Sequence, residues 1–109
     1  MRTLRFIVDR DTITKDPSCD FSNLFPGANP EVQAEFVFSP EWKNRAKVVG
    51  FYSILDKEYP PRMLNSENVC QIPQEALSRP AFKVKVLGKQ RGRVFETNTI
   101  TIYQRGGIR

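Results

Sequence analysis

Histidine is missing from this chain of 109 residues, and cysteine occurs only twice, at Cys19 and Cys70. Histidine is the side chain that most readily serves as a general base near neutral pH. The two cysteines lie far apart in the sequence and match no familiar zinc or redox spacing. We therefore expect a protein that is not an enzyme and that binds no metal and no cofactor.

Long apolar runs and phosphate-binding glycine loops are missing as well. No segment is apolar over enough residues to span a bilayer, and Arg5 and Asp9 interrupt the apolar start in a way that a signal peptide would not tolerate. Gly88 and Gly92 fit a turn between two strands better than a phosphate loop. We expect a protein that is made in the cytoplasm and makes no contact with a membrane. In cytosolic proteins two free cysteines are more common than a disulfide.

Two pairs of acidic residues could bind a cation. Asp9 and Asp11 flank Arg10, and Asp16 is followed shortly by Asp20. Aspartates in short polar segments usually form turns, because their carboxylates accept hydrogen bonds from the backbone that follows. We interpret both pairs as turn residues.

Alternating apolar and polar residues predict a series of short strands. The near-continuous apolar run at 46–53 predicts a central strand that is covered on both faces. The prolines before residues 62–64 place that segment at a sheet edge. The pattern of the last strand changes phase near residues 96–98, which predicts a β-bulge. Strands are expected near residues 3–8, 12–14, 32–38, 46–53, 62–64, 69–72, 82–87 and 94–103.

Two short helical turns complete the pattern. Ser39 is expected to cap the first, Pro40 occupies its first helical position, and Trp42 is expected to fill the core at one end of the sheet. The second covers residues 74–77. We predict an all-β fold, a single antiparallel β-sandwich of immunoglobulin-like type with seven or eight strands. It forms one domain over residues 1–109, with a long loop at 15–30 and a short C-terminal tail at 105–109.

The loop at 15–30 is rich in proline and glycine and yet carries Phe21, Leu24 and Phe25. Its turn-forming residues exclude a long helix or strand. The three apolar side chains either fold back onto the core or form a surface that docks on a partner. We favour the first interpretation for the loop and retain these residues as candidate contacts.

Basic residues dominate the C-terminal third, and the chain carries a net charge of +5. If Lys83 and Lys85 share a face with Arg91 or Arg93, together they form a basic stripe that could bind phosphates or an acidic protein surface. The simpler interpretation is that the lysines keep the solvent-facing side of a sheet soluble. We favour that interpretation and keep the four residues as candidate partner contacts.

Several segments together carry a resemblance to a known family. They are residues 36–43, 46–51, 69–77, which read VCQIPQEAL, 80–88 and 92–102, which contain TNT at 97–99. This pattern resembles a small immunoglobulin-like β-sandwich module of tailed-phage virion proteins, found at the N-terminus of upper-baseplate and head-fibre proteins. The resemblance covers about residues 31–104 and implies a module that anchors to a phage particle. Such relatives usually continue into a fibre, whereas this chain ends at Arg109.

From this resemblance we expect a non-enzymatic virion structural protein of a tailed bacteriophage. It would dock on the head or tail as a decoration, head-fibre or adaptor subunit, in several copies, through contacts with other capsid or tail proteins. Its location would be the virion. The alternative is a small, basic, nucleic-acid-binding β-barrel. The candidate contact residues are Phe21, Leu24, Phe25, Lys83, Lys85, Arg91 and Arg93.

Overall fold

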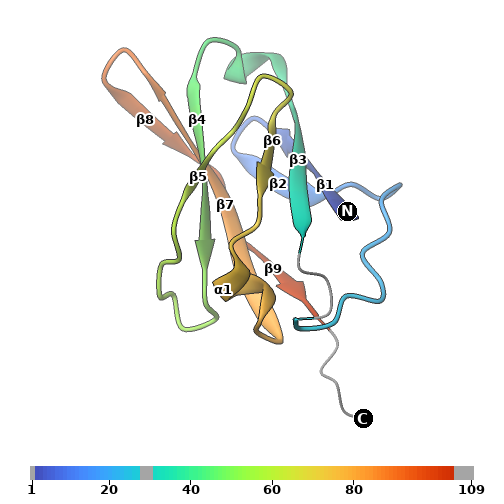
Figure 1. The fold of residues 1–109 in the computed structure, drawn as a ribbon. Helices are drawn as coiled ribbons and strands as arrows, with labels where there is room; N and C mark the ends of the chain where they lie inside the picture. The colour runs from blue at the N-terminus through green and yellow to red at the C-terminus, as the bar shows by residue number, and fades with distance from the viewer. Residues whose placement is uncertain (1, 28–30, 105–109) are drawn as a thin grey trace.

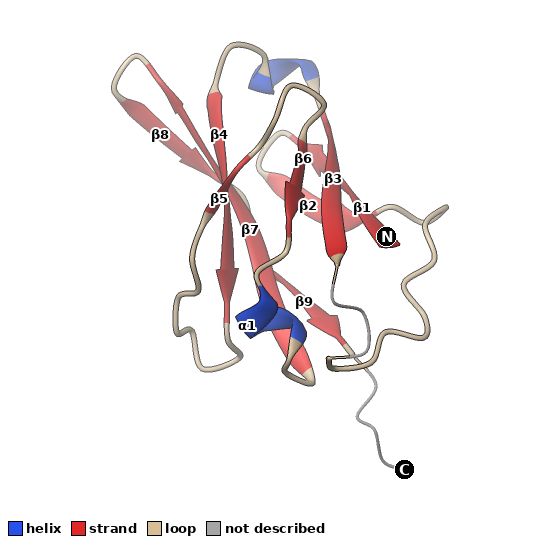
Figure 2. Cartoon of the chain, viewed as in Figure 1, coloured by secondary structure: helices blue, strands red, loops and turns tan. Residues whose placement is uncertain are grey.

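A computed structural model describes residues 2–27 and 31–104 as two β-sheets that face each other (Figures 1 and 2). The first sheet has the order β2 (Thr12–Lys15), β1 (Arg2–Asp9), β3 (Val32–Phe38) and β6 (Val69–Gln71). The second has the order β5 (Arg62–Met63), β4 (Ala46–Tyr52), β7 (Ala81–Gln90) and β8 (Arg93–Glu96), with β9 (Ile100–Tyr103) also paired to β7.

These elements confirm the predicted all-β sandwich. The described part of the chain contains nine strands, against seven or eight expected, together with two short helical turns, η1 (Pro40–Trp42) and α1 (Gln74–Leu77). The predicted tail at 105–109 and the last part of the loop, residues 28–30, lie outside the described residues.

One strand pair departs from the predicted antiparallel arrangement. β1 and β2 form the expected antiparallel hairpin, but β1 and β3 run parallel, in register from Arg2 opposite Val32 to Val8 opposite Phe38. Parallel neighbours need a long connection that carries the chain back to the start of the sheet. The loop at 15–30 belongs to that connection, so its length follows from the strand order.

β7 is the longest strand of the second sheet, and it pairs with β4 along one edge and with β8 and β9 along the other. Leu87 of β7 lies opposite Glu96, and Val84 of β7 lies opposite Ile100. The segment from Glu96 to Ile100 therefore contains one more residue than the segment of β7 that it faces. This extra residue confirms the predicted bulge. Thr97, near the start of this segment, is buried, and its hydroxyl accepts a hydrogen bond from the Val86 N–H.

The core lies between the sheets and is built from the alternating apolar residues of both. Trp42 is buried as predicted, and its indole N–H donates to the Arg10 carbonyl at 2.6 Å. Ser39 occupies the predicted N-cap position of η1, but its side chain makes no capping hydrogen bond and accepts the Arg10 N–H instead. Cys70 is buried in β6, which raises the pKa of its thiol to about 12, and both cysteines are free.

The described part of the loop at 15–30 packs onto the first sheet, which confirms the favoured interpretation. Leu24 is only 2% exposed, and the Phe21 ring meets the Phe6 ring edge-on with their centroids 5.5 Å apart. The Arg2 guanidinium holds the loop by donating to backbone carbonyls within residues 20–23. The Asp16 and Asp20 carboxylates accept hydrogen bonds from the serines two residues on, which lower the pKa of both groups.

Asn98 fastens the two sheets together along one side. It lies in the bulge of the second sheet, and its side-chain oxygen accepts the Ile13 N–H of β2 at 2.7 Å, while its amide donates to the Ile13 carbonyl at 3.4 Å. The Asn98 backbone N–H donates to the Asp11 carbonyl at 3.2 Å. A side chain thus occupies backbone groups at the open edge of β2 that would otherwise be available to another strand.

We expect Asn98→Ala to lower the free energy of unfolding by about 1–2 kcal/mol, because it leaves the backbone groups of Ile13 without their partners. Urea denaturation of the purified chain measures this change. Thr99→Ala, at the exposed neighbouring position, is the matched control and is expected to change stability by less than about 0.5 kcal/mol. Equal effects of the two substitutions would contradict a fastening role for Asn98.

Candidate docking surfaces

Of the three apolar loop residues named as candidate contacts, one is on the surface. Leu24 and most of Phe21 belong to the core, so Leu24 is unavailable as a contact residue in this conformation. Phe25 remains 38% exposed. The sequence could not distinguish these positions, because an irregular loop has no period that separates inner from outer side chains.

Lys83 and Lys85 lie on the outer face of the second sheet, as their alternation with buried neighbours predicts. Each is paired with a carboxylate from elsewhere in the chain. Lys83 Nζ lies 2.9 Å from Asp56 Oδ1, and Lys85 Nζ lies 3.0 Å from Glu96 Oε1. These ion pairs reduce the positive potential that either lysine presents to a polyanion.

Arg91 and Arg93 do not complete a basic stripe with the two lysines. Arg91 and Gly92 have positive φ angles of 53° and 76° and form the two-residue turn between β7 and β8. Arg93 pairs with Gln90, which places it on the inner side of the sheet, with its guanidinium 5.7 Å from the Phe95 ring centroid. The continuous stripe on which the nucleic-acid alternative depends is therefore not formed by these residues.

The outer face of the second sheet carries an apolar surface near the β7–β8 hairpin. We call it the outer patch and define it as Ala46, Val48, Met63, Leu87 and Val94. Val48 lies opposite Met63 on one neighbouring strand and opposite Leu87 on the other, while Ala46 and Val94 both lie opposite Lys89. These residues line a shallow depression of about 430 Å³.

Exposure of the outer patch corrects the expectation that β4 is covered on both faces. Val49 and Phe51 are fully buried on the inner face, but Met63 and Val94 are 69% and 58% exposed on the outer one. The apolar run at 46–53 contained the signal for this patch. We interpreted it as burial, because a run of apolar residues looks the same whether its second face meets its own chain or a partner.

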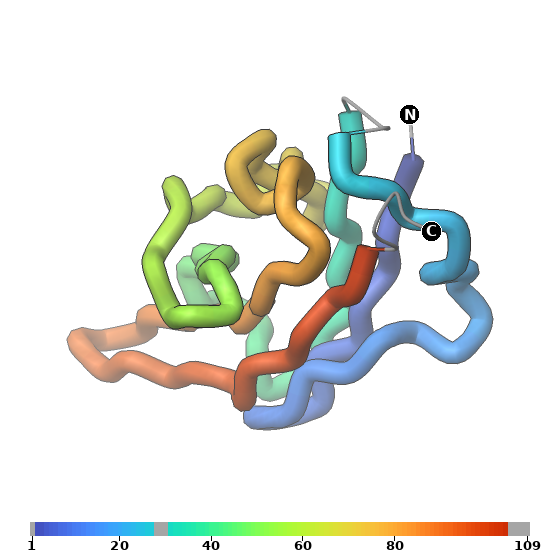
Figure 3. The backbone as a smooth tube through the Cα atoms, turned by 90° about the horizontal axis from the view of Figure 1, so that it is seen from below, coloured from blue at the N-terminus to red at the C-terminus, as the bar shows by residue number. Residues whose placement is uncertain are grey.

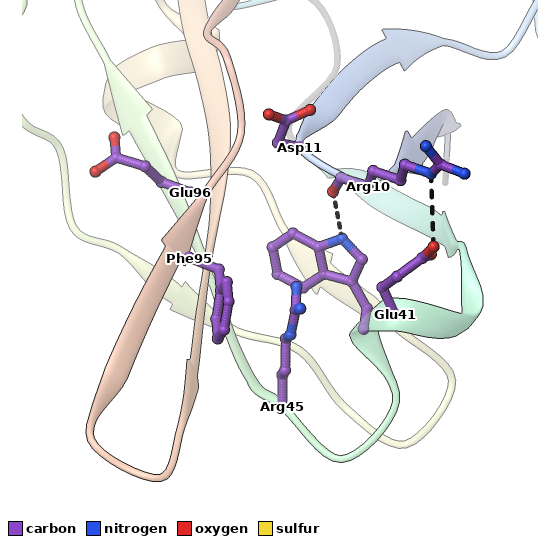
Figure 4. A pocket seen from close by; sticks show the side chains of 7 residues that line it. Arg10, Asp11, Glu41, Arg45, Phe95 and Glu96 are labelled. Carbon is purple, nitrogen blue, oxygen red and sulfur yellow. Dashed lines mark hydrogen bonds and ion pairs between the residues drawn. The ribbon is translucent and has the colours of Figure 1, made fainter.

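A second concave region, the end cleft, lies between the β1–β2 turn, η1 and β8 (Figure 4). The Arg45 guanidinium carbon lies close to two rings, 3.7 Å from the Phe95 centroid and 4.9 Å from that of Trp42. The cleft has a volume of about 610 Å³. Its lining residues are Arg10, Asp11, Glu41, Trp42, Arg45, Phe95 and Glu96.

Two of the three carboxylates in the end cleft are already paired. Glu41 lies 3.6 Å from Arg10, and hydrogen bonding from Ser39 lowers the pKa of the Glu41 carboxyl. Glu96 accepts the hydrogen bond from Lys85. Asp11 has no cationic partner within the described residues and accepts only a long hydrogen bond, 3.5 Å, from the Thr12 hydroxyl.

Comparison with known proteins adds no relative to these observations. No family model matches the chain, and a search of curated proteins gives no match. Among residues 2–27 and 31–104, no three acidic or cysteine side chains gather to hold a metal ion, and none of the helices there has the length and apolar character to cross a membrane. The outer patch and the end cleft are the two surfaces beside the β7–β8 hairpin.

The Lys85–Glu96 pair predicts a titration difference. The hydrogen bond that the Lys85 ammonium donates to Glu96 raises the pKa of Lys85 above its ordinary value. A raised folded-state pKa stabilises the fold below the unfolded pKa of about 10.4, and this stabilisation is lost as the pH rises through the folded pKa. Glu96→Gln should therefore lower the Lys85 pKa, as measured by NMR of the lysine side chain.

Asp56→Asn is the matched control for that titration, because it removes the partner of Lys83 and leaves Glu96 in place. It should not change the Lys85 pKa. If both variants shift Lys85 equally, general charge rather than the specific pair determines its titration.

Proposed function

We propose that this chain is a non-enzymatic structural subunit that docks on other proteins through the outer patch. The observation that carries the proposal is the exposure of Met63 and Val94 on the outer face of a sheet whose inner face buries Val49, Phe51 and Val86 completely. Contiguous exposed apolar surface on a folded domain is typical of a protein contact. Solubility alone would favour polar residues at these positions.

Basic residues beside the outer patch favour an acidic partner surface. Lys89 lines the depression itself, and Arg91 and Arg93 lie at the adjoining hairpin tip. None of the three has a carboxylate partner within the described residues. Apolar contact would supply most of the affinity, while these charges would select the partner and speed its approach.

The setting that we propose is the virion of a tailed bacteriophage, with the chain on the head or tail as a decoration, head-fibre or adaptor subunit. This part of the proposal is supported by the sequence resemblance, whose segments lie largely in β3, β4, β6, α1, β7 and β8. A small docking surface suits such a setting. Many copies on one symmetric particle can hold by avidity where a single contact would be weak.

Immunogold labelling of purified particles with an antibody to this chain tests the virion setting. Regular label on heads would support a decoration or head-fibre role, and label confined to the tail end would support an adaptor role. Chain that is found only free in the lysate, with unlabelled particles, would contradict the proposal.

Substitution of Met63 tests the outer patch. We expect Met63→Lys to weaken binding to particles that lack the chain by about tenfold or more, equivalent to about 1.4 kcal/mol, because a charge enters the apolar contact. Co-sedimentation with such particles measures the change. Leu55→Lys is the matched control, since Leu55 is 88% exposed but lies outside the patch. Loss of binding in both variants, or in neither, would contradict docking through this surface.

A further inference from the structure

β8 is the outermost strand of the second sheet along the upper part of β7, and with the end of β7 it projects from the body of the molecule (Figures 1 and 3). Within the described residues no other strand pairs with its outer edge. An open, projecting edge presents backbone donors and acceptors that another strand can bind.

The register shows which backbone groups face outward. Gln90 and Arg93 close the two-residue turn and therefore form a hydrogen-bonded pair, and such pairs alternate with non-bonded pairs along an antiparallel ladder. The N–H and C=O groups of Val94 and Glu96 consequently point away from β7. The Asn98 N–H also points away from β7 and donates to the Asp11 carbonyl. The open part of the edge therefore ends at Asn98.

Charge is distributed unevenly along this edge. Arg91 and Arg93 lie at the hairpin tip, whereas the base of the strand holds Glu96, which is paired with Lys85, and adjoins Asp11 across the end cleft. Asp11 has no cationic partner in the described part of the chain. An antiparallel copy of the same strand would bring its basic tip to this acidic base, and the arrangement would be repeated by symmetry.

We infer that β8 pairs with β8 of a second copy of this chain, antiparallel and about a two-fold axis at Val94. In this register Val94 lies opposite Val94 of the second copy, with their outward backbone groups bonded to each other. Arg93 lies opposite Phe95 of the second copy, and Arg91 approaches Asp11. A parallel strand would instead bring the two basic tips together, so the charges favour the two-fold arrangement.

This inference goes beyond the proposed function and has a consequence for it. A two-fold axis perpendicular to the plane of the sheet keeps both outer faces on the same side of the extended sheet. The two outer patches then adjoin across Val94 and present a single bivalent surface to a particle. Two short strands bury little area, so we expect a dissociation constant roughly between 10 μM and 1 mM.

Sedimentation equilibrium of the full chain from roughly 10 μM to 1 mM measures the dimer. Val94→Pro removes an outward N–H without removing a bond from the β7–β8 ladder, so the variant should fold and remain monomeric. Circular dichroism checks its fold. Met63→Lys, which alters the outer patch away from this edge, should still dimerise, so failure of the dimer is distinguishable from failure of docking.

Charge exchange provides a second test that does not depend on proline. Asp11→Arg and Arg91→Asp should each weaken association at least about threefold, and the double variant should restore it, because the reciprocal pair is re-formed with its signs exchanged. A chain that stays monomeric over the whole concentration range would overturn the inference. So would a dimer that withstands both Val94→Pro and the single charge changes.

Discussion

The rest of the structure depends on the burial of Trp42 between the two sheets. Its side chain is 1% exposed, and its N–H donates to the carbonyl of Arg10 in the β1–β2 turn of the first sheet. On the other side it packs on Gly88 of β7, where an added Cβ would lie 2.6 Å from the indole ring. One side chain therefore fixes a turn of one sheet against a strand of the other, and glycine at position 88 is required by the contact.

The same indole positions the projecting hairpin. The Arg45 guanidinium lies within cation–π distance of both Trp42 and Phe95, so this contact links β8 to η1. The outer edges of β2 and β8 differ in whether they are covered. Asn98 covers the edge of β2 with side-chain hydrogen bonds, whereas the edge of β8 extends beyond the first sheet and stays open.

Much of the fold could be predicted because strands leave a local pattern. The alternation of Leu4, Phe6 and Val8 identified a strand and its buried face, and the change of phase before Ile100 identified the bulge. The parallel pairing of β1 with β3 could not be predicted in this way. A strand has the same alternation whichever direction its neighbour runs, and the direction is decided by how the intervening loop returns the chain.

The sequence by itself determined which side chains share a face, because the period of a strand is set by local backbone geometry. Only the tertiary structure decided what each face meets. Lys83 and Lys85 were correctly placed on an outer face, but their partners Asp56 and Glu96 come from other segments brought close by the packing of the sheet. Likewise, the apolar residues around Val48 are an open surface rather than core, because burial depends on whether a second layer covers them, and the local pattern contains no information about that layer.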